Sequence, residues 1–223
     1  MISPSCNLKY RGKKYAKINL LKLNFILFLF PFLVWSQKVV EKRWQKPNFS
    51  KIFIDARWAS KVSFFGKENF NGVQIKYSSD GEYANDVIPK FKLNSEVLYF
   101  TENYSPTFYE FNDKLSTHKF VSSQIEIKFN SKISLELYVN DSEINGEGEV
   151  AFLEIFQRNG SCHLYNLKSK GSVKTINADI YIQKREINIS AKSINGEVNL
   201  AKKRNNKDSD LKIYSLNGDI IHK

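Results

Sequence analysis

The sequence predicts an all-β protein, and more narrowly a right-handed parallel β-solenoid of the single-stranded β-helix type. Three observations predict it. Short runs of alternating apolar and polar residues fill the chain after residue 47, no long helical pattern occurs, and one eight-residue phrase recurs near the end. An antiparallel β-sandwich is the alternative. We expect one domain over residues 48–223, with a less regular N-terminal half and regular coils from about residue 141.

Residues 1–36 have the composition of a secretory signal peptide. The first 22 residues carry six basic side chains and no acid, and an apolar run that ends at Ser36 follows them. We expect cleavage after Ser36 and a short linker over residues 37–47. The alternative is a membrane anchor, but a span needs ~20 apolar residues and this run is shorter. The cleaved protein is therefore expected to have no stable membrane span.

The charge of the chain is concentrated in that first segment. The whole sequence has 34 Lys and Arg against 23 Asp and Glu, which gives a formal charge of +11. Removal of residues 1–36 lowers it to +5, and the remaining basic residues are scattered. A scattered charge of this size does not make the basic face that nucleic acid requires, so we expect no nucleic-acid partner.

The two cysteines predict neither a disulfide nor a cysteine metal site. Cys6 lies in the expected signal peptide, which leaves Cys162 alone in the exported chain. One thiol cannot form an internal disulfide or a cysteine cluster around a metal ion. We interpret Cys162 as a small buried apolar residue.

The first half of the exported chain is predicted to form β-strands. Six runs are rich in β-branched and aromatic residues, and most of them alternate with period two, which indicates one buried and one exposed face. Residues of the turn-forming types fill the gaps between them. A few helical turns are conceivable at 82–88 or 111–115. The six predicted strands are 51–58, 61–65, 73–77, 96–100, 123–129 and 133–139.

The recurring phrase occurs as TINADIYI from Thr175, SINGEVNL from Ser193 and SLNGDIIH from Ser215, and a weaker copy lies at 144–150. In the strand that leads up to each Ser or Thr, the residues expected to face inward have odd numbers. From the Ile or Leu that follows, the residues expected to face inward have even numbers. In a straight strand this shift would turn the apolar residues outward. The chain must therefore bend at each copy, where Asn and Gly tolerate the backbone angles of a corner.

Two architectures can place three such corners. A series of antiparallel hairpins is one, because Asn-Gly is a strong hairpin signal. The other is a solenoid, in which Asn177, Asn195 and Asn217 occupy the same corner of successive coils, with Gly196 and Gly218 beside them. The intervals of 18 and 22 residues are about one coil. In that case the amides stack at the strand spacing of ~4.8 Å and form a ladder.

The phrases INGEV and LNGDI, repeated at this interval behind a signal peptide, resemble the adhesin families of exported bacterial β-solenoids known as GIN-domain and DUF4097-type proteins, which are common in the Bacteroidetes. The stretches GEYANDVIPK (81–90) and DKLSTHKF (113–120) also resemble segments of such proteins. The resemblance covers about residues 48–223. It implies a β-solenoid with an adhesin-like binding role.

No catalytic, cofactor or metal site is expected. His118, His163 and His222 have no metal-ligand spacing, and no phosphate-binding or nucleophile motif occurs. His163 follows Cys162, but neighbouring residues of a strand face opposite sides. The acids that follow the corners are interpreted as turn residues that face solvent: Asp179, Glu197 and Asp219.

The aromatic stretch LYFTENYSPTFYEF (98–111) supplies a candidate ligand surface. Exposed rings on a flat β surface can stack on sugar rings or anchor a protein partner. The alternative is that the rings fill the core or cover the end of the solenoid. The residues concerned are Tyr99, Tyr104, Phe108 and Tyr109.

Together these patterns predict an exported, non-enzymatic binding protein of the cell envelope, either periplasmic or on the cell surface, whose partner is an envelope protein or a glycan. A polysaccharide-active β-helix enzyme and a structural accessory subunit are the alternatives. Because the last phrase ends the sequence, we also expect a free strand edge there, through which the chain could form a homo-oligomer.

Overall fold

The structure is a computed structural model that describes residues 38–81, 84–106, 121–183, 188–200 and 210–222. The chain divides into two units, residues 1–36 and 37–223, and all described residues belong to the second. The expected signal peptide, His118, Phe108 and Tyr109 therefore lie outside the described residues, as does the expected turn at 111–115.

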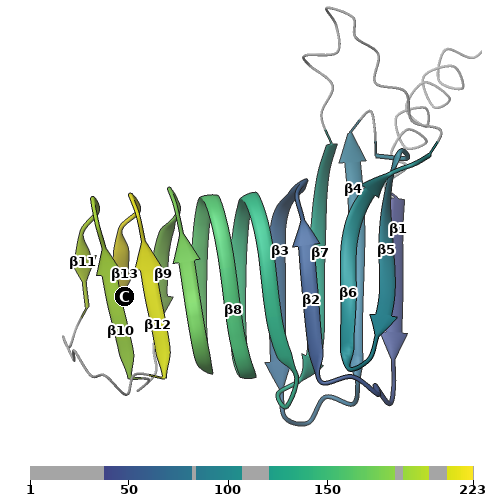
Figure 1. Cartoon of the computed structure of the whole chain (residues 1–223), viewed down its shortest axis with the longest axis horizontal. Helices are drawn as coiled ribbons and strands as arrows, with labels where there is room; N and C mark the ends of the chain where they lie inside the picture. Colours follow the sequence, from purple (N-terminus) through teal and green to yellow (C-terminus); the bar gives the residue numbers. More distant parts are fainter. Residues whose placement is uncertain (1–37, 82–83, 107–120, 184–187, 201–209, 223) are drawn as a thin grey trace, which may run out of the picture. The chain divides into compact units, whose positions relative to one another are not determined.

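The described residues contain thirteen strands and no helix, and the strands join one sheet (Figure 1). This confirms an all-β protein. The sheet is mixed, so the expectation of purely parallel pairing was wrong. The strands are β1 (Lys38–Trp44), β2 (Lys51–Ala56), β3 (Ala59–Lys67), β4 (Val73–Gly81), β5 (Val87–Asn94), β6 (Val97–Tyr104), β7 (Val121–Asn130), β8 (Ser134–Thr175), β9 (Asp179–Gln183), β10 (Ile189–Ser193), β11 (Val198–Asn199), β12 (Leu211–Ser215) and β13 (Ile220–His222).

The antiparallel pairs lie in the N-terminal half, and besides the pair of β4 with β7 they involve two strands that the sequence did not predict. Strand β1 pairs with β4, and β5 pairs with β6. The linker expected over 37–47 is thus mostly strand β1, whose Val40 and Trp44 pack against the core. Basic residues interrupt the alternation of apolar and polar residues in β1, and Pro89 interrupts it in β5. The period-two pattern therefore did not identify these two strands. Five of the six predicted strands are confirmed within a few residues, and the sixth, 133–139, is the first part of the much longer strand β8.

Strand β8 is unusually long because it is wound rather than straight. Figure 1 shows it as a coiled ribbon between β2–β3 and β9–β12. Successive segments of β8 pair in parallel with β2, β3, β9 and β12. One continuous strand therefore supplies several of the side-by-side strand segments of the sheet. Each of these segments is called a row below.

The change of parity at each repeated phrase is present. Val173 and Thr175 are buried, Asn177 is exposed, and Ala178 and Ile180 are buried again. The first apolar residue of each corner was expected to face inward, but Ile194 is 52% exposed. The bend is spread over two residues rather than located between two neighbouring residues. The first of the two, Ile194 in this copy, therefore lies on the outside of the corner.

The three phrases pair in parallel and in register, but not in the order of the sequence. Ala191 pairs with Ile213, and Ile213 pairs with Val173. Strand β12 therefore lies between β8 and β10, and β13 lies between β9 and β11. The C-terminal strands are interior, which corrects the expectation of a free edge there. Among the described strands, β10 and β11 form the edge at this end of the sheet.

The inward-facing side chains of all these rows form one hydrophobic core. The types of side chain in this core change along the chain. In the N-terminal half it holds large rings, among them Phe64, Tyr77, Phe100 and Phe129, all fully buried. In the C-terminal half it holds aliphatic side chains such as Val173, Ile180 and Ile213. The alternate, outward positions of β2, β6 and β8 remain partly exposed, and the candidate site lies there.

Candidate functional site

The repeated asparagines form a hydrogen-bonded ladder along the corners. Asn195 Nδ2 donates to Asn217 Oδ1 (2.6 Å), and Asn217 Nδ2 donates to Asn177 Oδ1 (2.6 Å). Asn177 Nδ2 in turn donates to Asn159 Oδ1 (2.7 Å), and the Asn159 amide donates to Asp141. Each of these side-chain amides donates to the side chain at the same corner of the neighbouring row. The ladder therefore aligns the rows and serves as scaffold.

The glycines beside the ladder allow the rows to approach closely. A Cβ atom on Gly218 would lie 2.1 Å from the carbonyl oxygen of Ala178, and one on Gly196 would lie 2.4 Å from that of Gly218. Gly160 follows Asn159 in the row beyond Asn177, at the place that Gly218 and Gly196 occupy in their own rows. The corner at Asn159 and Gly160 was missed because Ser/Thr does not precede it, although it lies 18 residues before Asn177.

In the weaker copy of the phrase at 144–150, the Asn145-Gly146 step does not form a corner. Gly146 lies within a strand segment opposite Phe64 of β3. A Cβ atom there would lie 2.2 Å from Cζ of Phe64, so the glycine makes room for that ring in the core. A small residue under a buried aromatic and a corner glycine look alike in sequence.

The acids that follow the corners were expected to face solvent, and two of them also bond to backbone. The N–H of Glu197 donates to Asp219 Oδ1 (2.7 Å), and the N–H of Asp219 donates to Asp179 Oδ1 (2.9 Å). These carboxylates satisfy backbone donors of the next row, which gives a structural reason for an acid after each corner.

Cys162 and His163 face opposite sides of β8, as expected from strand geometry. Cys162 is fully buried, and burial raises the pKa of its thiol to about 12. The His163 ring stacks on Tyr181 at 4.7 Å and on Tyr165 at 6.1 Å. The thiol is thus protonated at neutral pH and has no contact with the imidazole.

This arrangement predicts an unreactive thiol. In a Cys6→Ser variant, where Cys162 is the remaining cysteine, we expect negligible labelling by a thiol reagent at pH 8 and full labelling after unfolding, because the reagent needs an exposed thiolate. The measurement is a colorimetric thiol assay with and without denaturant. Rapid labelling of the folded protein would contradict the buried position.

Four outward-facing rings form a continuous row across the sheet, which we call the outer aromatic row: Tyr99, Phe53, Tyr138 and Phe156. Phe53 of β2 is in register with Tyr99 of β6, and their ring centroids are 5.3 Å apart. Tyr138 lies 5.3 Å beyond Phe53, and Phe156 lies 6.1 Å beyond Tyr138. The rings are partly exposed, and Phe156 is 39% exposed. The row therefore presents a broad apolar strip to solvent.

Charged side chains accompany the row. Lys51 forms an ion pair with Glu136, whose Oε1 also accepts a hydrogen bond from the Tyr138 hydroxyl (2.9 Å). That hydrogen bond is the main reason why the pKa of Tyr138 is raised above the usual value. Lys174 lies 3.9 Å from Glu154 on the same part of β8. The strip is thus apolar at its centre with hydrogen-bonding groups beside it.

The predicted ligand residues are not all brought together. Tyr99 belongs to the outer aromatic row. Tyr104, 41% exposed, instead packs on Trp58 with centroids 4.7 Å apart. Phe53 and Tyr138 were not singled out from the sequence, although both stand at outward positions of their alternating runs. Their alignment with Tyr99 depends on strand pairing that local pattern does not reveal.

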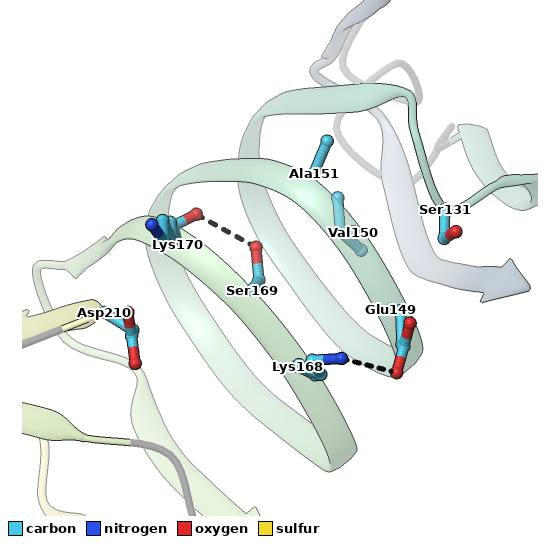
Figure 2. A pocket seen from close by; sticks show the side chains of 8 residues that line it. All are labelled: Ser131, Glu149, Val150, Ala151, Lys168, Ser169, Lys170 and Asp210. Carbon is cyan, nitrogen blue, oxygen red and sulfur yellow. Dashed lines mark hydrogen bonds and ion pairs between the residues drawn. The ribbon is translucent and has the colours of Figure 1, made fainter. Parts of the chain in front are cut away.

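A surface hollow of about 370 Å³ lies beside the corners of β8 (Figure 2). Figure 2 shows Lys168 Nζ directed at Glu149 Oε1, 3.1 Å away, and the Ser169 hydroxyl directed at the carbonyl of Lys170. The side chains of Lys168, Glu149 and Ser169 are thus bonded within the protein. It is lined by Ser131, Glu149, Val150, Ala151, Lys168, Ser169, Lys170 and Asp210.

One acid is buried in the N-terminal half. Glu102 is 6% exposed, its Oε2 accepts from the N–H of Trp58 (2.9 Å), and its Oε1 accepts from the Ser123 hydroxyl. Burial raises its pKa above the usual glutamate value, and the negative charge of Asp55 adds to this. Glu102 stands at the inward parity of β6, with Leu98 and Phe100, and that signal could have identified it from sequence.

Among the residues that the structure describes, no group of three or more His, Cys, Asp or Glu side chains could hold a metal ion. The same residues include no helix of the length and apolarity needed to cross a membrane.

No protein-family model matches the sequence, and no curated protein matches it. Solved structures do. A "putative cell adhesion protein" from Clostridium sporogenes superposes with a TM-score of 0.57 at 17% identity, over 84% of this chain and 99% of that one. A "putative adhesin" from Bacteroides fragilis is 12% identical and covers 84% and 98% of the two chains, with a TM-score of 0.30. The first superposition shows a shared fold.

Proposed function

We propose that this chain is an exported, non-enzymatic β-solenoid of the GIN-domain and DUF4097 adhesin type, which binds a carbohydrate chain at the cell envelope through its outer aromatic row. Three features support the solenoid: in-register parallel pairing of the repeated phrases, the asparagine ladder, and the wound strand β8. The fold shared with the Clostridium sporogenes protein agrees with it. The composition of residues 1–36 supports export.

The outer aromatic row is the observation that carries the binding function. Aromatic side chains give a large contact area at low entropic cost, and their faces suit the apolar faces of sugar rings. Rings repeated at 5.3, 5.3 and 6.1 Å form a strip rather than a pocket, which suits an extended ligand. Asp55 and Glu136 alternate with the rings along the strands and can accept hydrogen bonds from hydroxyl groups.

The direct test is binding to a glycan array and to extracted envelope polysaccharide. Phe53→Ala and Tyr138→Ala are each expected to weaken binding about ten-fold or more, since loss of a central aromatic anchor costs about 1.4 kcal/mol or more. Tyr165→Ala is the matched control, because Tyr165 is an outward ring that stacks on His163 away from the row. Binding unchanged in both row variants would contradict the proposal.

Two other results would each support a different function. If the row variants lose an envelope protein from a pull-down and no glycan binds, the chain is an accessory subunit. Turnover of any glycan in the panel, abolished by a change of one acid such as Glu136→Gln, would show an enzyme. Glycan binding without turnover is the outcome expected from the proposed function.

A further inference from the structure

The edge of the sheet at β10 and β11 is an incompletely covered end of the core. Among the described strands, β10 pairs with β12 alone and β11 with β13 alone. Ala191 and Val198 are partly exposed, whereas their partners one row inside, Ile213 and Ile220, are at most 2% exposed. The partly exposed apolar side chains at this edge are Ile189, Ala191, Val198 and Leu200.

The edge also lacks the features that prevent strand pairing elsewhere in the chain. Strand β5 carries Pro89 and two lysines, and β1 carries four charged residues. Proline and charge are common protections of exposed edges. Strand β10 has one charged residue, Lys192, and β11 has none.

The backbone of β10 is arranged to accept another strand. The N–H of Leu211 donates to the carbonyl of Asn188, and the N–H of Ile194 donates to that of Ser215. Even-numbered residues of β10 therefore direct their backbone groups toward β12. Since alternate residues of a strand bond to opposite sides, Ile189, Ala191 and Ser193 direct theirs to the open side.

We propose that a second copy of this chain covers the edge, with the two β10 strands antiparallel about a two-fold axis at Ala191. A closed homodimer requires such self-complementary pairing. This register places Ala191 opposite its own counterpart and Lys192 opposite Ser190 of the partner subunit. Centring on Lys192 instead would place two lysines face to face, which is destabilising.

The repeated phrase supports a second copy as the occupant. Within one chain β10 already pairs in parallel with β12, and β12 with β8, so the side chains of this sequence pack well beside near-copies of themselves. In this register the two Ala191 side chains lie opposite each other, Ile189 lies opposite Ser193 of the partner subunit, and the contact buries these inward-facing side chains. No residue of the outer aromatic row lies on β10 or β11, so the dimer carries two complete rows and could bind a long ligand with avidity.

The first test is the oligomeric state of protein expressed from the full 223-residue sequence, by sedimentation velocity over a wide concentration range. A reversible dimer is expected. Ser190→Lys should weaken it about ten-fold, because Lys192 of the partner subunit faces the new charge twice in the dimer. Lys192→Glu alone should leave the dimer intact, and Lys192→Glu combined with Ser190→Lys should restore it. A strict monomer at every concentration overturns the proposal.

The second test fixes the register and does not depend on affinity. Antiparallel bonded pairs have Cα atoms ~5.5 Å apart, within the range of a disulfide. Ala191→Cys, in a Cys6→Ser background, should therefore form an interchain disulfide under mild oxidation, while Ser172→Cys, on an interior row, should not. A dimer that resists Ser190→Lys and gives no interchain cross-link in the Ala191→Cys variant also overturns the proposal.

Discussion

Gly160→Ala is expected to lower the free energy of unfolding by about 3 kcal/mol or more. Gly160 has a φ of +106°, and a Cβ atom there would lie 2.0 Å from the carbonyl oxygen of Ser142 in the neighbouring row. Two penalties therefore combine: a backbone conformation that side chains rarely adopt, and a contact that only a shift of the rows relieves. Denaturant titration followed by circular dichroism measures the change.

Gly196→Ala is the matched control at the equivalent corner of the edge row. Its added Cβ would lie 2.4 Å from the carbonyl of Gly218, but its φ is not in the left-handed range. In the monomer the edge row is packed on one side by the described strands, so it can move outward at protein concentrations too low for dimer formation. We expect a loss well below that of Gly160→Ala. Equal losses in the two variants, or a loss under about 0.5 kcal/mol at Gly160, would contradict close packing of the inner corners.

The sequence contained the local geometry of this fold but not its long-range order. Alternation identified the strands with one buried face, and the change of parity at Thr175, Ser193 and Ser215 identified the bends. These features depend on neighbouring residues only. The position of β12 between β8 and β10 could not be predicted, because SINGEVNL and SLNGDIIH offer the same corner residues to either row.

The candidate site shows the same division. That Phe53 and Tyr99 face outward follows from the alternation of their runs. That their rings meet depends on parallel pairing of β2 with β6, which are separated by β3, β4 and β5 in the chain. Glu102 could have been recognised, since an acid at an inward position is costly without partners. Its partners, Trp58 and Ser123, come from two other segments and could not.

Glu102→Leu is expected to lower the free energy of unfolding at neutral pH by about 2–4 kcal/mol, and Glu102→Gln far less. Leucine leaves the N–H of Trp58 and the fully buried hydroxyl of Ser123 without an acceptor, and each such loss costs about 1–3 kcal/mol. Glutamine keeps an acceptor for Trp58, and its amide can donate to a rotated Ser123 hydroxyl. Denaturant titration of both variants measures the difference, and equal losses would contradict the hydrogen-bonding role.

The same pair of proteins, wild type and Glu102→Gln, tests the raised pKa. Burial first, and the charge of Asp55 in addition, hold the Glu102 pKa above the ordinary value of 4.5, against the hydrogen bonds from Ser123 and Trp58. The folded chain therefore keeps this proton at a pH where the unfolded chain has lost it. Between those two pKa values the unfolded state binds fewer protons, so stability falls as pH rises, by at most ~1.4 kcal/mol per pH unit.

Glu102→Gln cannot titrate at this position, so subtraction of its free energy of unfolding from that of the wild type isolates the carboxyl group. The difference is expected to be most favourable to the wild type below pH 4.5, to decline as pH rises through the folded pKa, and to be flat above it. Contributions that do not involve position 102 cancel to first order, because both proteins share them. A difference that rises with pH would show that the carboxylate is stabilised in the fold by its hydrogen bonds more than burial penalises it.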